Sequence, residues 1–306
     1  MLTANQLRQV AGRSGARDIG NVEIDVILTY LLQLFSEKGI TAHVAFKGGT
    51  MLRKMVFGPR GRLSTDLDFT CCTDISADDL MMMMLEVVEQ SYHGISFRFD
   101  RDKDWYMTEE GCAVNPVCAH VENEKGVKIK LQVSMRERPV LPVRPMQQLP
   151  MDHFKLLEFA PAEIPSLALE EAVAEKICAA SQRSKIRDLH DLSEIARRAL
   201  DRDLIRSLAV LKLWGSNGPN LDYGRFRERI EGAGDYDMAE LSALLRKDQR
   251  PDLGEMIQRV IDEFRFLGDL TELEKLLAGD EARRMNSEAE KLRAVAQGRA
   301  KAQARR

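Results

Sequence analysis

Two aspartates, Asp66 and Asp68, are separated by one residue in the alternating segment LSTDLDFT. In a β-strand, side chains two residues apart point to the same side, so both carboxylates would face one cation or a pair of cations. Magnesium suits such a site, because it binds through one or two carboxylates and leaves positions for substrate phosphates. The spacing therefore predicts a magnesium site, with manganese as an alternative, on one face of a strand.

A glycine pair precedes this segment. Gly48 and Gly49 stand between the apolar run 44–46 and a helical pattern that opens at Thr50. Without Cβ atoms, the backbone can approach a triphosphate closely and direct N–H groups toward it, and the N-terminal end of a helix adds positive potential. A lone glycine pair is usually only a turn, and a lone pair of aspartates is often a chance spacing. Their joint occurrence favours a site for transfer of a phosphate-containing group.

The segment FKGGTMLRKMVFGPRGRLSTDLDF resembles the AbiEii/AbiGii nucleotidyltransferase-like toxin family of the DNA polymerase beta-like superfamily. The superfamily signature is a GG[ST] turn followed by an acidic strand with two aspartates, and the resemblance is strong across residues 21–70. It implies that Asp66 and Asp68 bind magnesium and are catalytic. It implies a nucleotide-binding role for Lys47, Gly48, Gly49, Thr50, Arg62 and Ser64. In this family the serine is a phosphorylation target or a nucleotide contact.

One position departs from the superfamily pattern. Many members carry a third carboxylate on a later strand, where it acts as general base. The matching strand here is expected within 127–135, and the acid position holds Gln132. A neutral amide cannot accept a proton as a carboxylate does, so either the base comes from elsewhere or metal activation is sufficient.

A second set of residues lies in EEAVAEKICAASQRSKIRDLHDL. It resembles the family's second motif, which implies catalytic roles for Lys176 and Asp188 and nucleotide-binding roles for Arg183, Arg187 and Asp191. Helical spacing also places the three basic residues and Ala180 on one face, which would form a positive ridge for phosphates. The simpler alternative is an amphipathic helix with a solvated basic edge. A break near Ser184 would instead put Asp188 at the start of a new helix, and His190 is expected to be exposed.

The pattern of elements predicts an α/β N-terminal nucleotidyltransferase domain with a small mixed sheet, followed by an all-α C-terminal domain. Prolines concentrate near 140–165, which places the boundary there. We expect a nucleotidyltransferase domain over 1–150, a helical domain over 151–279, and a charged helical or disordered tail over 280–306. The tail contains the basic residues Arg283, Arg284, Lys291, Arg293, Arg299, Lys301, Arg305 and Arg306.

Composition excludes several classes of protein. The net charge of −3 gives no general attraction to nucleic acid, so a basic patch would have to be local. The five cysteines form no CxxC pair, which argues against a disulfide framework or a structural zinc site. No stretch is expected to span a membrane, and the N-terminus lacks a signal-peptide pattern. A cytoplasmic protein with reduced thiols is expected.

The family resemblance implies the toxin of a bacterial toxin–antitoxin system linked to phage defence. Its expected partners are a nucleoside triphosphate, a tRNA whose 3′ end accepts the nucleotide, and a cognate antitoxin protein. Two alternatives stay open at this point: the same chemistry on a protein or small-molecule acceptor, and a catalytically silent protein that binds a nucleotide or a partner. Gln132 supports the silent alternative.

Overall fold

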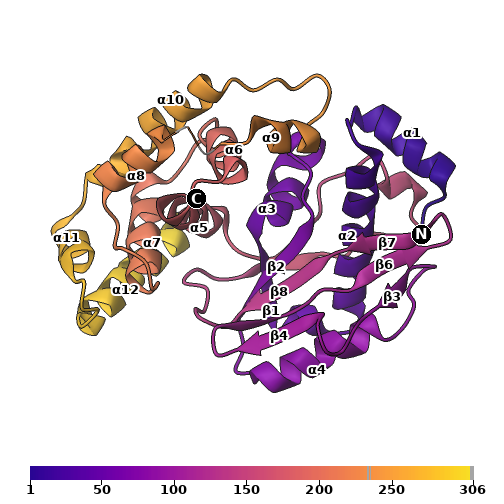
Figure 1. Ribbon diagram of the computed structural model, residues 1–306. Coiled ribbons are helices and arrows are strands. Elements are labelled where there is room, and N and C mark those ends of the chain that lie inside the picture. Colours follow the sequence, from indigo (N-terminus) through magenta and orange to yellow (C-terminus); the bar gives the residue numbers. More distant parts are fainter. Residues whose placement is uncertain (233, 235, 304–306) are drawn as a thin grey trace. The chain divides into compact units, whose positions relative to one another are not determined.

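The computed structural model describes residues 1–232, 234 and 236–303 (Figure 1). Contacts between residues divide the chain into two units. Unit 1 comprises Met1–Pro139, Val143–Leu167 and Ser242–Gln249, and unit 2 comprises Val140–Pro142, Ala168–Leu241 and Arg250–Arg306. The domain boundaries expected after residues 150 and 279 stay predictions.

A mixed seven-stranded sheet forms the centre of unit 1, in the order β4-β5-β8-β2-β1-β10-β9. Its strands, in sequence order, are β1 (Val44–Lys47), β2 (Asp66–Cys71), β4 (Trp105–Thr108), β5 (Gly111–Val114), β8 (Lys130–Ser134), β9 (Arg144–Met146) and β10 (Ile164–Ser166). The β2–β8 and β1–β10 pairs are parallel, and the other pairs are antiparallel. The mixed sheet expected from the sequence is confirmed, although it is larger than expected.

Helices cover the sheet face opposite to Asp66 and Asp68. The helices of unit 1 are α1 (Ala4–Ser14), α2 (Ile19–Glu37), α3 (Gly48–Met51), the π-helix η2 (Leu52–Phe57) that continues α3, the short η1 (Ile40–Ala42), η3 (Gly58–Arg60) and η4 (Phe154–Leu156), and α4 (Ala77–Val88). Phe35 of α2 stacks on Phe69 of β2 at 5.5 Å between ring centroids, and Met84 of α4 meets Cys112 of β5 at 3.9 Å between sulfur atoms. Because side chains alternate along a strand, the two aspartates of β2 project from the other face.

A second, three-stranded sheet completes unit 1. It consists of β3 (Ser96–Arg98), β6 (Val117–His120) and β7 (Asn123–Lys128), in the order β3-β6-β7. The single strand expected over 127–135 is therefore two strands, β7 and β8, which belong to different sheets. The proline-rich region near 140–165, where the domain boundary was expected, leads into β10, which belongs to the large sheet.

Helix α2 has the length and composition of a membrane span, although no span was expected from the sequence. Its apolar window is 61% buried within the protein. Val26, Ile27, Leu28 and Leu31 are completely covered. The hydrophobicity of α2 is thus accounted for by its place in the core of unit 1.

Unit 2 is built from helices in the part of the chain that the structure describes. They are α5 (Leu169–Gln182), α6 (Ile186–Ile195), α7 (Arg202–Trp214), α8 (Tyr223–Glu231), α9 (Met238–Leu244), whose last residues belong to unit 1, α10 (Leu253–Glu263), η6 (Phe264–Gly268), α11 (Glu272–Gly279) and α12 (Asn286–Gln303). The charged tail is a packed helix and not a solvated appendage. Ala289, Leu292 and Ala296 of α12 are buried, and Arg299 pairs with Asp201 at 2.7 Å. Arg305 and Arg306 lie outside the described residues.

Candidate active site

The glycine turn lies directly against Asp68. Lys47, at the end of β1, pairs in register with Asp68 on β2. Gly48 then adopts a φ of +80°, in the left-handed region that favours glycine, and begins α3. A Cβ built on Gly48 would come within 2.6 Å of Asp68 Oδ2. The absence of a side chain on Gly48 thus allows the backbone turn to touch a carboxylate of the acidic pair, and the helix begins two residues earlier than expected.

Thr50 fixes the backbone of the acidic strand β2 at Asp66. Its side chain is buried, and its hydroxyl donates a hydrogen bond of 2.5 Å to the backbone carbonyl of Asp66. Thr65 donates from its own hydroxyl to the Asp66 carboxylate at 2.7 Å. These bonds fix both the backbone and the side chain of Asp66. The structure therefore gives Thr50 a positioning role, in addition to the phosphate contact that the sequence predicts.

Arg62 places a cation against the second glycine. A Cβ on Gly49 would collide with the Arg62 guanidinium, which is buried and donates to the Leu63 carbonyl at 3.2 Å. Its positive charge therefore lies beside the turn that is expected to hold phosphates. Ser64 is also buried, at 5% exposure. Phosphorylation of Ser64 would require this part of the chain to open.

Asp66 and Asp68 fit a magnesium ion. Both side chains are half-buried on one face of β2, whereas Leu67 and Phe69 between and beyond them are buried on the other. In the described part of the chain, no third His, Cys, Asp or Glu completes a three-residue cluster that could hold a metal. Two carboxylates are nevertheless enough for magnesium, since phosphate oxygens and water supply its other ligands.

Gln132 occupies the place expected for a third acid. Parallel strand β8 aligns Gln132 with Asp68 in register, so the two side chains share one face of the sheet. The amide can donate or accept hydrogen bonds there, but it carries no charge and is not a proton acceptor at neutral pH. The departure from the superfamily pattern thus lies next to the acidic pair.

A buried ionic cluster supports the helix that follows the glycine turn. Arg53 in η2 binds both carboxylate oxygens of Asp25 in α2 at 3.0 Å, and Lys54 donates to Asp25 Oδ1 at 3.2 Å. Burial opposes ionisation of Asp25, but the two cations outweigh it and hold the pKa of the carboxyl well below its usual range. Lys54 also donates to Thr29, which contacts His153 at 2.9 Å. Burial lowers the pKa of His153 to about 3, so its ring is neutral.

Sequence reasoning missed this cluster. Its signal was a single aspartate in the apolar segment of α2 and a basic pair after the GGT motif. Because the pairing joins residues far apart in sequence, local patterns do not show it.

In unit 2, Lys176 lies between two carboxylates. Its ammonium is 3.0 Å from Asp188 Oδ1 and 2.7 Å from Asp191 Oδ2, and all three side chains are buried. Arg183 adds a bond of 2.8 Å from its Nε to Asp188 Oδ2. The motif residues Lys176, Arg183, Asp188 and Asp191 therefore meet in one cluster, in which two positive charges balance two negative ones.

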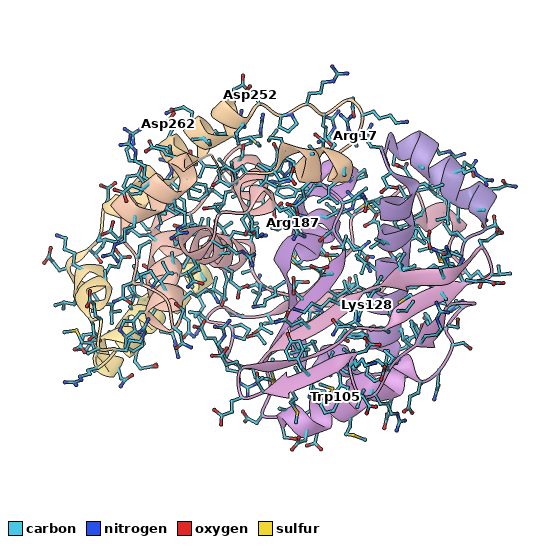
Figure 2. The ribbon with its side chains drawn as sticks, viewed as in Figure 1. Arg17, Trp105, Lys128, Arg187, Asp252 and Asp262 are labelled. Atoms are coloured by element: carbon cyan, nitrogen blue, oxygen red, sulfur yellow. The ribbon has the colours of Figure 1, made fainter. Side chains whose placement is uncertain are left out.

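The expected basic ridge is corrected by this arrangement. Helix α5 ends at Gln182 and α6 begins at Ile186, so Arg183 and Arg187 do not continue the helical face of Lys176. Arg187, labelled in Figure 2, pairs instead with Glu240 at 3.0 Å. Each cation of the motif thus has a carboxylate partner, and the region is not a ridge of uncompensated charge.

Two further details concern the acids of α6. Burial opposes ionisation of Asp188, but Lys176 and Arg183 outweigh it and lower the pKa of this carboxyl. His190, expected to be exposed, is buried at 3% exposure. Its Nδ1 lies 3.8 Å from Asp191 Oδ1, too far for a hydrogen bond.

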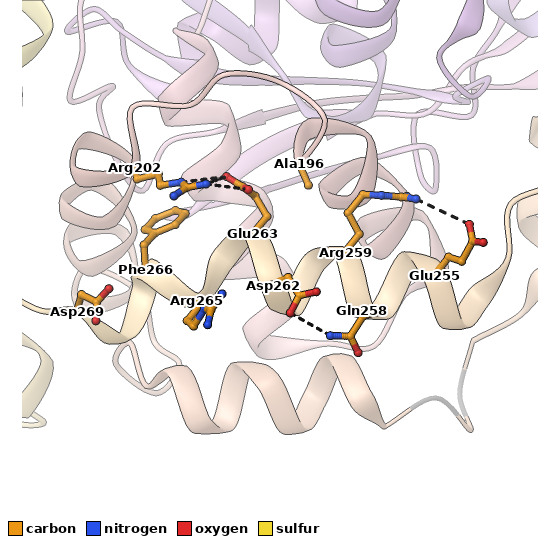
Figure 3. Close-up of a pocket in the computed structure, with 10 residues that line it drawn as sticks. All are labelled: Ala196, Arg202, Glu255, Gln258, Arg259, Asp262, Glu263, Arg265, Phe266 and Asp269. Atoms are coloured by element: carbon orange, nitrogen blue, oxygen red, sulfur yellow. Dashed lines mark hydrogen bonds and ion pairs between the residues drawn. The ribbon is translucent and has the colours of Figure 1, made fainter.

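A hollow of about 730 Å³ lies elsewhere on unit 2 (Figure 3). It is lined by Ala196, Arg202, Glu255, Gln258, Arg259, Asp262, Glu263, Arg265, Phe266 and Asp269. Its charged groups largely satisfy one another, as in the paired bonds from Arg202 to Glu263 at 2.9 and 3.0 Å. None of the motif residues lines this hollow, and its mixed charges do not indicate one class of ligand.

Comparisons with known proteins show which family and which solved structures the chain resembles. A family model for the nucleotidyl transferase AbiEii toxin of a type IV toxin–antitoxin system matches residues 30–279. Among solved structures, MenT4, a nucleotidyltransferase toxin from Mycobacterium tuberculosis, is 28% identical over 97% of this chain and 100% of that chain, with a TM-score of 0.78. JHP933 from Helicobacter pylori is 17% identical over 88% of this chain and 97% of its own, with a TM-score of 0.48. No curated protein matches the sequence.

Proposed function

The chain belongs to the AbiEii family of nucleotidyltransferase toxins of type IV toxin–antitoxin systems, and we propose that it uses magnesium held by Asp66 and Asp68 to transfer a nucleotide onto RNA. The family implies a nucleotide substrate and an antitoxin partner. One observation carries the proposal for this chain: the two carboxylates share one face of β2, and the glycine turn lies against Asp68.

The reaction is an in-line displacement at the α-phosphorus of the triphosphate. An acceptor hydroxyl oxygen forms the new bond to phosphorus, the bond to the β-phosphate oxygen breaks, and pyrophosphate leaves. Magnesium, when bound, neutralises phosphate oxygens and lowers the pKa of the attacking hydroxyl. The backbone of Gly48 and Gly49 binds the phosphates, and the charge of Arg62 behind Gly49 favours their approach.

The proton of the attacking hydroxyl must leave without help from Gln132. The neutral amide next to Asp68 cannot take it, although it can accept a hydrogen bond from the hydroxyl and orient it. The proton can instead pass to water, because the pKa of the attacking hydroxyl is lowered. Lys47, in register with Asp68, places a further cation on the same face of the sheet.

We assign Lys176 and Asp188 to the same reaction because the family's second motif contains them. Within unit 2, Lys176 fixes Asp188 and Asp191, and Arg183 completes the charge balance. The proposal for these residues is that they bind and orient the nucleotide as a preassembled polar cluster. Because the charges of these residues balance one another, the cluster is not proposed to attract phosphate through a net positive charge.

The acceptor is proposed to be RNA, with the 3′ end of tRNA as the specific target. The resemblance of the motifs supports this choice, and the alternatives are a protein or a small molecule. The experiment incubates the protein with magnesium, each nucleoside triphosphate labelled at the α-phosphate, and either total tRNA or total cell protein. Parallel reactions contain EDTA, or manganese in place of magnesium.

Label that appears in tRNA, disappears with EDTA and is absent with Asp68→Asn supports the proposal. Label found only in protein means that the acceptor assignment is wrong, whereas the assignment of the carboxylates stands. Labelling that persists in EDTA contradicts the metal assignment. No labelling by any triphosphate, with tRNA or protein, contradicts the proposed reaction.

A further inference from the structure

A row of paired residues crosses the large sheet from the acidic pair to its edge. In register, Asp68 of β2 pairs with Gln132 of β8, Gln132 with Ala113 of β5, and Ala113 with Tyr106 of β4. Residues that are directly opposite each other on paired strands project from the same face of a sheet. Tyr106 therefore shares a face with Asp68, three strand spacings away, or about 14 Å at roughly 4.8 Å each.

Tyr106 is an exposed aromatic residue on an edge strand. Its side chain is 39% exposed, and β4 has β5 as its strand partner at the end of the sheet. Its ring lies on the same face of the sheet as the acidic pair and offers a flat apolar surface on which a ligand can stack. Ala113, which separates it from Gln132, carries only a methyl group. The face between the carboxylates and the ring therefore contains no large side chain on β5.

Lys130 reaches toward this ring and away from the carboxylates. It pairs in register with Asp66, yet its ammonium lies 5.6 Å from the centroid of the Tyr106 ring, across β5. Within the residues that the structure describes, Lys130 makes no ion pair with a carboxylate. The face thus presents an aromatic ring together with a cation that is available for a phosphate.

An aromatic ring beside a cation is an arrangement that proteins use to bind single-stranded nucleic acid. A base stacks on the ring, and the cation contacts the adjoining phosphate. We propose that Tyr106 and Lys130 form a platform that binds an unpaired segment of the RNA acceptor a few nucleotides from its reacting end. At about 3.4 Å per stacked nucleotide, about four nucleotides span the distance from Tyr106 to the acidic pair. This inference rests on the proposed function, since it names a binding site for that reaction's acceptor.

The chain offers matched controls for both residues. Trp105 precedes Tyr106 on β4 and is equally exposed, at 39%, but the alternation of the strand directs it to the other face. Lys128 lies at the end of β7, two residues before Lys130, and pairs with Asp104 at 2.6 Å. Both control residues are labelled in Figure 2. Substitution of Trp105 removes an exposed aromatic ring of the same strand, and substitution of Lys128 removes the same charge, without touching the proposed platform.

The test measures binding of a fluorescently labelled, unstructured single-stranded RNA of mixed sequence by anisotropy. Tyr106→Ala and Tyr106→Leu should weaken binding about 5- to 150-fold, the loss expected for one base stack, whereas Tyr106→Phe should retain it. Lys130→Gln should reduce the slope of log affinity against log salt by about 0.7, the value for one phosphate contact on a single strand. Trp105→Ala and Lys128→Gln should bind as the wild type does.

The same variants are then tested for binding of magnesium and a triphosphate by calorimetry, which should be unchanged by Tyr106→Ala. Wild-type protein that binds the triphosphate but not the RNA overturns the platform and leaves the catalytic assignment standing. Equal losses for Tyr106→Ala and Trp105→Ala also overturn it, because the effect would then belong to β4 as a whole. Tyr106-dependent labelling of protein and not of RNA shows that the platform binds a protein segment. A wild-type protein that does not bind the triphosphate would instead contradict the proposed function.

Discussion

The carboxylate of Asp68 lies against the backbone of Gly48, so closely that a Cβ on Gly48 would stand 2.6 Å from Asp68 Oδ2. This contact brings the turn that begins α3 next to a carboxylate suited to magnesium. The two parts of the motif are thus in contact, as transfer from a metal-bound triphosphate requires.

We expect Gly48→Ala to damage both the fold and the activity. The left-handed φ of +80° costs a non-glycine residue of order 1–3 kcal/mol, and the new methyl group would displace Asp68. Urea unfolding should report the first effect and magnesium-dependent transfer the second. Gly12→Ala is the control, because Gly12 lies within α1 with open space around it and should be unaffected or slightly stabilised. Full activity of Gly48→Ala would mean that the turn does not position Asp68.

Gly49→Val should reduce triphosphate affinity more than Thr50→Ala does. A side chain on Gly49 would displace the buried Arg62 guanidinium and block the backbone. Loss of the Thr50 hydroxyl removes one hydrogen bond to the Asp66 carbonyl, worth about 1 kcal/mol. Isothermal calorimetry with a non-hydrolysable triphosphate gives the ranking. The reverse order would place the phosphates elsewhere on the protein.

Short motifs and long, strongly periodic elements could be predicted from the sequence, because their signals are local. The alternation of β2 correctly placed Asp66 and Asp68 on one face of a strand. The superfamily pattern pointed to Gln132, which lies in register with Asp68. In each case, a few neighbouring residues determine the geometry.

Features that depend on tertiary contacts could not be predicted in this way. Alternation runs through residues 127–134 without glycine or proline, so the division between β7 and β8 at Ile129 was not visible in the sequence. Neither glycine nor proline marks the end of α5, so the sequence left open both a continuous basic face from Lys176 to Arg187 and a break near Ser184, and the structure confirms the break. The pairing of Asp25 with Arg53 joins residues of two different helices, and only the packed structure brings them together.

Lys176→Ala should destabilise unit 2, whereas removal of a solvated lysine would have little effect on stability. Removal of the ammonium leaves Asp188 and Asp191 as buried carboxylates without their shared partner, a change that typically costs about 3–5 kcal/mol. Arg183→Ala is the matched control, because that side chain is largely exposed and its loss should cost less than about 1 kcal/mol. Urea unfolding monitored by circular dichroism measures both. Equal, small effects would show that the Lys176 cluster does not stabilise the fold.

The contribution of Asp188 to stability should be lost in acid. Its pKa is lowered in the folded protein from an ordinary value of 3.8, so ionised Asp188 stabilises the fold above that value. The contribution falls as the pH decreases below 3.8 toward the folded pKa. The difference in unfolding free energy between the wild type and Asp188→Asn should therefore be constant between pH 5 and 7 and shrink below about pH 4. A difference that grows in acid would contradict the sign of the shift.

The dependence of nucleotide transfer on magnesium concentration tests the central claim most directly, with Asp66→Asn and Asp68→Asn compared with the wild type. Both carboxylates are half-buried on an open face, so each variant should unfold as the wild type does, within about 1 kcal/mol. Transfer should fall by orders of magnitude and should require more magnesium where activity remains. Asp74→Asn, which changes a fully exposed carboxylate paired with Arg138, should behave as the wild type. A folded Asp66→Asn or Asp68→Asn variant with normal turnover and normal magnesium dependence would contradict the assignment of that residue as a metal ligand.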